Sequence, residues 1–402
     1  MFSFSNLQSS VKQYVLITGN YWAFTLTDGA LRMLVVLHFY QLGYSPLSIA
    51  MLFLFYEVFG VVTNLLGGWL GSRFGLNQTM NYGLFVQIIA LIMLLVPNEF
   101  LTVIWVMIAQ ALSGIAKDLN KMSAKSAIKL LVPNQSDSNN KLYKWVAILT
   151  GSKNAMKGFG FFLGAALLSS VGFFWAAASM AIMLFIILII SVVTLEKNLG
   201  KVKQKTKFSH IFSKSKSINS LSLARLFLFG ARDVWFVVAL PVYFSSQLLW
   251  EHWQVGSFMA IWVIGYGIIQ SIAPKITGHS PDGRTALIWC LMLSLITLLI
   301  TYTFANLGIY EEIILVVGLM VFGIFFAINS SLHSYLIVNY SSKQSISMDV
   351  GFYYMANASG RLLGTILSGT IYQKYGLGAC LLASFAMLVI ASLTSLKLPR
   401  NK

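Results

Sequence analysis

Five basic residues lie deep inside apolar segments of this sequence, where an unpaired charge is costly. With a helical rise of 1.5 Å per residue, each lies about 14–20 Å from a segment end, near the middle of a hydrocarbon layer about 30 Å thick. The surplus of positive charge predicts a site for a multiply charged anion, because arginine binds phosphate-like groups bidentately. These cations are Arg32, Lys153, Lys157, Arg232 and Arg361.

Two of these cations share a helix face with glycines. Lys153 and Lys157 are four residues apart, and Gly160 and Gly164 follow on the same face. Glycines mark close helix packing, so this face is expected to point inward. Two neighbouring cations without a local acid favour ligand binding over a structural role.

The acidic residues leave several interpretations open. Asp28 lies four residues before Arg32, the spacing of an intrahelical ion pair, so it either holds that pair or takes part in gating. Arg361 either binds ligand or pairs with Asp28 or Asp233. Proton antiport and facilitated exit both remain possible. The candidates for proton coupling or gating are Asp28, Glu57, Asp118 and Asp233, of which Asp233 is expected to be paired.

A basic stripe continues the pattern. Lys117, Lys121 and Lys125 repeat every four residues. They form either a helix end that extends lysines to lipid head groups or a funnel that attracts anions from the cytoplasm. Tyr21 and Asn357 are further candidates for lining the substrate cavity, although aromatic and amide side chains more often serve packing.

The elements that carry these residues must cross a membrane. Of 402 residues, 57% are hydrophobic and 10% are charged, against about 25% charged in soluble domains. The apolar blocks are long enough to span a bilayer as helices. We therefore expect an all-α membrane protein with twelve transmembrane helices near 14–42, 49–71, 79–96, 101–123, 145–170, 173–194, 221–245, 254–274, 285–305, 313–337, 348–371 and 377–396.

The net charge of +16 is mainly a signal of topology. With the N-terminus inside, 18 of the 28 Lys and Arg residues fall in cytoplasmic segments, and only Lys374 falls in an external loop. This bias predicts a multi-pass protein of the bacterial inner membrane with both termini in the cytoplasm. Nucleic acid is not an expected partner, because the basic residues are spread over many loops. The expected partners are the lipid bilayer and a small anionic substrate.

The chain divides into two similar halves. Residues 1–195 and 221–402 each predict a six-helix bundle, and 196–220 predict a basic cytoplasmic linker. Gly29 and Gly230 are 201 residues apart, while Gly160 and Gly360 are 200 apart. These offsets indicate a duplicated six-helix unit.

Two motifs resemble those of the major facilitator superfamily. Residues 68–75 read GWLGSRFG and resemble its loop motif G-x-x-x-D-R-x-G-R-R, with Ser72 in place of the Asp. Residues 160–165 read GFFLGA and resemble the antiporter motif G-x-x-x-G-P without its Pro. The resemblance implies two pseudo-symmetric bundles and secondary transport by alternating access. The departures remove the motif-based argument for proton antiport.

A closer resemblance is to the ArsJ-type organoarsenical efflux permeases. It is carried by residues 20–39, NYWAFTLTDGALRMLVVLHF, and 111–126, ALSGIAKDLNKMSAKS. It implies export of 1-arseno-3-phosphoglycerate and arsenate resistance. It also implies a functional link to glyceraldehyde-3-phosphate dehydrogenase, which makes this ester when arsenate replaces phosphate. Because the ester has an oxyanion group at each end, both bundles could share it.

The same residues are compatible with some other functions and argue against others. A carrier for another phosphorylated metabolite or organic anion would have the same basic cavity. Extrusion of As(III) would favour thiolates, but the two cysteines, Cys290 and Cys380, lie in different predicted helices. We expect no enzyme, cofactor or metal site, because the five histidines form no evident site and no P-loop is present. A monomer is expected.

Overall fold

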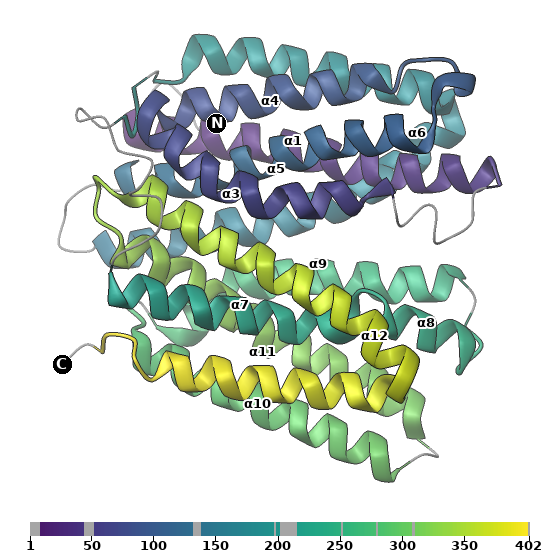
Figure 1. Ribbon diagram of the computed structural model, residues 1–402. Coiled ribbons are helices and arrows are strands. Elements are labelled where there is room, and N and C mark those ends of the chain that lie inside the picture. Colours follow the sequence, from purple (N-terminus) through teal and green to yellow (C-terminus); the bar gives the residue numbers. More distant parts are fainter. Residues whose placement is uncertain are drawn as a thin grey trace, which may run out of the picture. The chain divides into compact units, whose positions relative to one another are not determined.

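The computed structural model describes residues 9–43, 52–131, 138–196, 198–201, 215–250, 252–278, 280–307 and 310–400. The regular elements in these ranges are all helices (Figure 1). Helices suit long apolar segments, because their backbone groups hydrogen-bond within the segment and need no water. They are α1 (Ser9–Gln41), α3 (Leu54–Phe74), α4 (Leu76–Met93), η2 (Asn98–Phe100), α5 (Val103–Leu131), α6 (Ser138–Thr194), α7 (Lys216–Phe236), α8 (Ala239–Ser246), α9 (His252–Thr277), α10 (Gly283–Asn306), α11 (Glu311–Tyr340) and α12 (Ile346–Ser395).

Two of these helices are each a pair joined at a glycine. The backbone leaves helical geometry at Gly172 in α6, with φ 77°, and at Gly376 in α12, with φ 76°. Glycine adopts this left-handed region readily, whereas other residues are strained there. With α7 and α8 forming one crossing, the described residues contain twelve helical segments. This confirms the predicted all-α fold of two six-helix halves. Seven of the described helices are long and apolar enough to cross a membrane, by length and composition alone.

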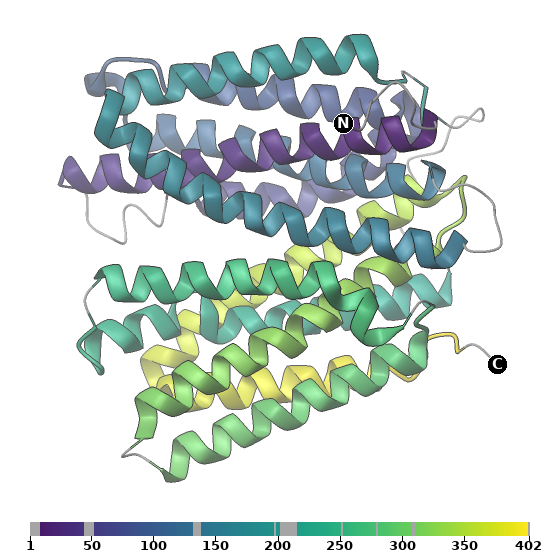
Figure 2. The ribbon, with the colours of Figure 1, turned by 180° about the vertical axis from the view of Figure 1, so that it is seen from behind.

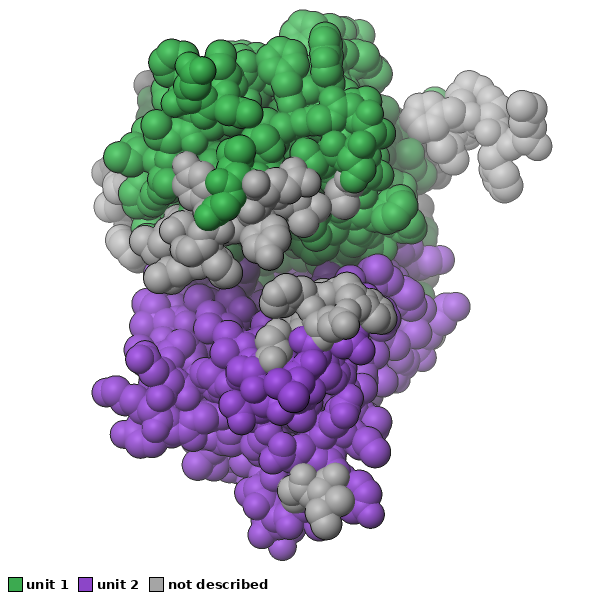
Figure 3. Space-filling model, turned by 90° about the vertical axis from the view of Figure 1, so that its right-hand side faces the viewer, with its two compact units in different colours: residues 1–142, 152–212, 341–355 green, residues 143–151, 213–340, 356–402 purple. Residues whose placement is uncertain are grey.

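Contacts divide the chain into two compact units, coloured separately in Figure 3. Unit 1 comprises residues 1–142, 152–212 and 341–355, and unit 2 comprises residues 143–151, 213–340 and 356–402. Each unit therefore includes a short segment from the other half of the sequence, at the start of α12 or of α6. The division at 196–220 stays a prediction.

In unit 1, α1 packs against α6 at glycines. A Cβ atom on Gly29 would lie 2.7 Å from the Lys157 carbonyl oxygen and 3.3 Å from the Gly160 Cα. Only glycines allow this approach, so it fixes the α1 residues that face α6. The apolar core around this contact includes Phe24, Leu31 and residues of α4 and α5 (Figure 1).

Unit 2 repeats this packing between α7 and α12. A Cβ atom on Gly230 would lie 3.2 Å from the Gly360 carbonyl oxygen, and one on Gly364 would lie 2.7 Å from the Gly230 carbonyl oxygen. The core here is aromatic. Trp235 packs edge-on against Phe322, with ring centroids 5.1 Å apart. Figure 2 shows α9, α10 and α11, which complete this half, from behind.

Residues 341–355 in unit 1 and residues 143–151 in unit 2 also pack at glycines. In unit 1, the Ser347 hydroxyl at the start of α12 donates a hydrogen bond of 2.6 Å to the Gly68 carbonyl on α3. In unit 2, Gly151 at the start of α6 lies directly against Ser271 on α9. In both segments a glycine lies at the contact between the helices.

Several helix ends differ by some residues from the approximate bounds that the sequence predicted. Helix α7 begins at Lys216, five residues before the expected start of that helix at 221, so the end of the predicted linker is helical. Residues 197 and 202–214 of this linker, with most of its lysines, lie outside the described residues.

Candidate functional site

Asp28 lies at the centre of a polar cluster in unit 1. The Tyr56 hydroxyl on α3 donates a hydrogen bond of 2.7 Å to Asp28 Oδ1. The Lys157 ammonium on α6 lies 3.8 Å from Asp28 Oδ2. The glycine contact between α1 and α6 positions this pair, because it lets the two backbones approach next to Asp28.

Arg32 binds a carboxylate on another helix rather than one on its own. Its Nη2 atom lies 3.5 Å from Glu57 Oε1 on α3. The guanidinium also lies over the rings of Phe53 and Tyr56, at 5.0 and 4.9 Å from their centroids. The sequence left open an intrahelical ion pair between Asp28 and Arg32. In the structure, Arg32 instead pairs with Glu57 on α3, and Asp28 pairs with Lys157 on α6.

Asp118 on α5 is held by two lysines of the basic stripe. Lys121 Nζ lies 2.5 Å from Asp118 Oδ1, and Lys117 Nζ lies 3.8 Å from Oδ2. The Lys117 ammonium also lies 3.7 Å from the centroid of the Tyr56 ring. A Cβ on Gly60 would lie 2.9 Å from Asp118 Oδ2, so glycine leaves room for this carboxylate beside α3.

The remaining unit 1 candidates are inside the unit or half-buried. Lys125 is 3% exposed, and its ammonium lies 5.1 Å from the Tyr354 ring centroid, with Lys121 at 4.6 Å from the same ring. Such burial does not fit lysines that extend to lipid head groups. Tyr21 is fully buried and Lys153 is half-buried.

Asp233 organises the corresponding region of unit 2. This carboxylate is 0% exposed, and Arg232 Nη2 lies 2.5 Å from its Oδ1. Arg361 Nε, on α12, lies 3.2 Å from Oδ2. Asp233 is therefore paired, as expected. Of the roles considered for Arg361, the structure shows the ion pair with Asp233. The Arg361 side chain remains 32% exposed.

The sequence interpretation missed Arg225. This residue on α7 is 3% exposed, and its guanidinium donates to Asn357 Oδ1 at 2.8 Å and to the Ser330 carbonyl at 3.1 Å. It contacts Asn357, one of the predicted substrate-binding residues. Arg225 and Arg232 are seven residues apart, two helical turns, and this spacing was the available signal.

Positive charge exceeds negative charge in both units. The clusters described above contain seven cations, Arg32, Lys117, Lys121, Lys157, Arg225, Arg232 and Arg361, and four carboxylates, Asp28, Glu57, Asp118 and Asp233. All four carboxylates already have cationic partners. The arrangement therefore suits a ligand that brings its own negative charge.

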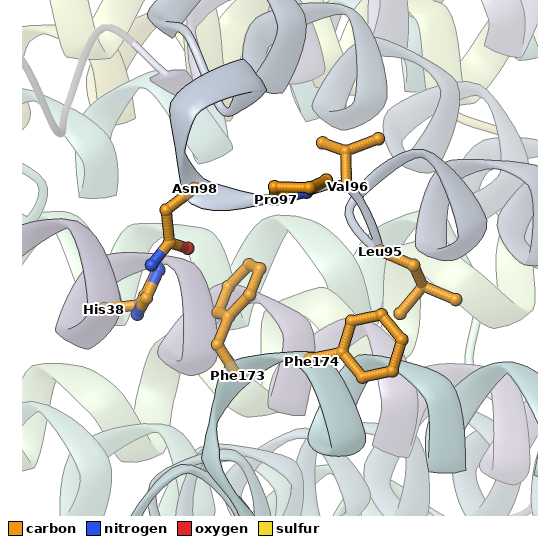
Figure 4. Close-up of a pocket in the computed structure, with 7 residues that line it drawn as sticks. All are labelled: His38, Leu95, Val96, Pro97, Asn98, Phe173 and Phe174. Carbon is orange, nitrogen blue, oxygen red and sulfur yellow. The ribbon is translucent and has the colours of Figure 1, made fainter.

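A separate cavity of about 370 Å³ lies in unit 1 (Figure 4). It is lined by His38, by residues 95–98 and by two phenylalanines. The His38 ring stacks on Phe173, with centroids 4.1 Å apart, and forms a hydrogen bond with Asn98. No charged residue of the two clusters lines it, so we treat His38 as a packing residue.

Both cysteines are buried thiols. Cys290 on α10 and Cys380 on α12 are each 0% exposed and form no disulfide. Among the residues that the structure describes, no group of three or more His, Cys, Asp or Glu side chains could hold a metal ion.

Comparisons with solved structures show the fold. A bacterial homologue of the iron transporter ferroportin, in an outward-facing state, matches with a TM-score of 0.79 and 14% identity over 96% of this chain and 98% of that one. The human organic anion transporter MFSD10 matches with a TM-score of 0.76 and 13% identity over 97% and 100%. The fucose:proton symporter of E. coli matches with a TM-score of 0.75 and 11% identity over 96% and 98%.

The assignment of the chain to a family is based on a sequence match. No curated protein sequence matches this chain significantly. The family model of the Major Facilitator Superfamily, however, matches residues 17–281, well over half of the chain. The chain therefore belongs to the Major Facilitator Superfamily and is a multi-pass membrane protein, a secondary carrier.

Proposed function

We propose that this carrier exports 1-arseno-3-phosphoglycerate from the cytoplasm and so confers resistance to arsenate. The observation that carries the anion specificity is the arginine group of unit 2, where three guanidiniums accompany the single carboxylate Asp233. Three guanidiniums beside one carboxylate carry net positive charge, which a bound dianion stabilises.

The chemistry of each cluster suits an oxyanion. Arginine presents parallel N–H donors that match two oxygens of a phosphate or arsenate group, whereas lysine acts as a compact charge. Unit 2 supplies arginines, and unit 1 supplies lysines together with Arg32. Each cluster, taken by itself, has the charge to bind an oxyanion group of the substrate. Resemblance to the organoarsenical permeases supports the choice of this ester over other dianions.

The cellular setting follows from the sequence. We place the protein in the bacterial inner membrane with both termini in the cytoplasm, because the basic residues gather in alternate loops. The carrier acts as a monomer and receives its substrate from glyceraldehyde-3-phosphate dehydrogenase. Outside the cell, the ester hydrolyses to arsenate.

Transport in everted membrane vesicles tests this function. Vesicles that contain the protein should accumulate the ester, and deletion of the gene should lower arsenate resistance. Lys153→Ala and Arg361→Ala should each abolish accumulation while the protein still inserts at normal levels. The same assay with and without an imposed pH gradient tests whether transport is coupled to proton movement. The candidate proton carriers are Asp28, Glu57 and Asp118.

Two results would contradict the proposal. Full export by both alanine variants would remove the proposed site. Accumulation of other phosphorylated metabolites, without the ester and without an effect on arsenate resistance, would assign the protein to a different anion carrier.

A further inference from the structure

A polar stretch interrupts the apolar helix α11. Residues 329–334 read NSSLHS, and all six are 0% exposed. They lie in unit 2, where α11 packs against α7 and α9. Polar side chains inside a membrane-spanning helix are costly and mark functional positions by default.

The serines of this stretch have clear partners. The Tyr266 hydroxyl on α9 donates to Ser330 Oγ at 2.8 Å. The Ser331 hydroxyl donates to the Gln270 carbonyl at 3.2 Å. These bonds satisfy the polar groups and join α9 to α11.

His333 differs from its neighbours. Its side chain is 0% exposed, and within the described parts of the chain neither Nδ1 nor Nε2 has a hydrogen-bond partner. Leaving a buried polar group without a partner costs about 1–3 kcal/mol, and such groups are rare in native structures. A histidine at this position is therefore expected to serve a ligand rather than the fold.

Arg225 and Asn357 are linked to the same polar stretch of α11. Arg225 donates to the Ser330 carbonyl, and Ser330 is three residues before His333, so both occupy neighbouring positions on α11. Arg225 also contacts a third helix. Through its Nε atom it holds Asn357 on α12. Hydrogen bonds of Arg225 thus join α7 to α12 and to α11 one turn before His333.

We propose that Arg225, His333 and Asn357 form a phosphate-binding subsite in unit 2. The imidazole donates through one ring nitrogen, the amide group of Asn357 donates through Nδ2, and the guanidinium supplies positive charge. This set of donors with positive charge matches the oxygens of a phosphate or arsenate group. The inference rests on the proposed export function and assigns the residues that receive one end of the substrate.

Binding to the full-length protein in detergent tests the subsite. Titration calorimetry with 3-phosphoglycerate, inorganic arsenate and glycerate compares a phosphate ester, an arsenate ion and a carboxylate alone. Wild type should bind the first two and not glycerate. His333→Leu should weaken binding of 3-phosphoglycerate at least tenfold without lowering Tm, because it removes a polar group that has no partner. His333→Gln, which keeps an N–H donor, should stay within threefold of wild type.

Two further variants keep the test decisive. His38→Leu alters a histidine of unit 1 and should leave the affinity unchanged. Asn357→Leu should weaken binding at least tenfold and replaces His333→Leu if that variant does not fold. The subsite is overturned if His333→Leu lowers Tm with unchanged affinity, if Asn357→Leu binds as wild type does, or if wild type binds neither oxyanion.

The same data separate this inference from the export function. Loss of 3-phosphoglycerate binding in the variants, with no ester accumulation by wild-type vesicles, would support the subsite and reject export. Ester accumulation with unchanged affinity in every variant would support export and reject the subsite.

Discussion

The helix contacts of α1 with α6 and of α7 with α12 have the same construction. Gly29 lies against Gly160 in unit 1, and Gly230 lies against Gly360 in unit 2. The two members of each equivalent pair are 201 and 200 residues apart. Close packing leaves no room for larger side chains at these positions, so the repeated framework has been kept.

The charged residues around these contacts differ. At equivalent positions the two units have Asp28 and Phe229, Arg32 and Asp233, and Lys157 and Asn357. Unit 1 combines mainly lysines with three carboxylates and a tyrosine, whereas unit 2 places arginines around one carboxylate. The comparison indicates that the two units share the packing framework and differ in the charged residues around it.

The largest expected effect comes from removing the single acid of the arginine cluster. Asp233→Asn leaves Arg232 and Arg361 without their carboxylate, and breaking such a buried pair costs about 3–5 kcal/mol. Asp118→Asn in unit 1 should cost less, because its lysine partners are flexible. Thermal unfolding in detergent measures both variants. Equal losses would show that the two clusters do not differ in this respect.

The hydrogen bond from Tyr56 to Asp28 in the unit 1 cluster gives the next largest effect. Tyr56→Phe removes the hydroxyl that donates to Asp28, and a hydrogen bond to a charged group contributes about 1.5–3 kcal/mol. We expect a lower Tm with normal membrane insertion. Tyr14→Phe is a control on α1, outside this cluster. A Tm equal to that of wild type for Tyr56→Phe would mean that this bond does not stabilise unit 1.

Exchanging the two kinds of cation should sharpen the comparison. Arg361→Lys should lower ester accumulation about tenfold, or about 1.4 kcal/mol, because lysine cannot bind two oxygens in parallel. Lys157→Arg should retain activity within about threefold, since a point charge is sufficient there. Initial rates of ester uptake into everted vesicles measure the activity of both variants. Similar losses for both exchanges would contradict the division into a lysine cluster and an arginine cluster.

The smallest expected effect belongs to the cysteines. Replacing both Cys290 and Cys380 with alanine should leave ester transport within twofold of wild type, because neither thiol belongs to a cluster. A large loss of transport in a variant that folds normally would instead favour a carrier of As(III).

Much of the framework could be predicted from the sequence. Long apolar segments and repeated glycines depend on local composition and spacing, so they indicated the two six-helix halves before any contact was known. The pairing of Asp233 was also predicted, because the arginines Arg232 and Arg361 are so deep in apolar segments.

The partners of Arg32 and Asp28 could not be predicted in the same way. They depend on how α3 and α6 are rotated toward α1, and no local pattern fixes that rotation. Arg225 was missed because the start of its helix was placed five residues too late, which put it near a helix end. His333 gave no signal, since its burial results from packing among several helices.

The inaccessibility of the two thiols makes the natural chain a good background for site-specific labels. A cysteine introduced on an exposed helix face would react with a maleimide reagent, while Cys290 and Cys380 would be shielded in the folded protein. One such label in each unit would report the distance between them by spectroscopy, and its change during a transport cycle, without prior removal of native cysteines.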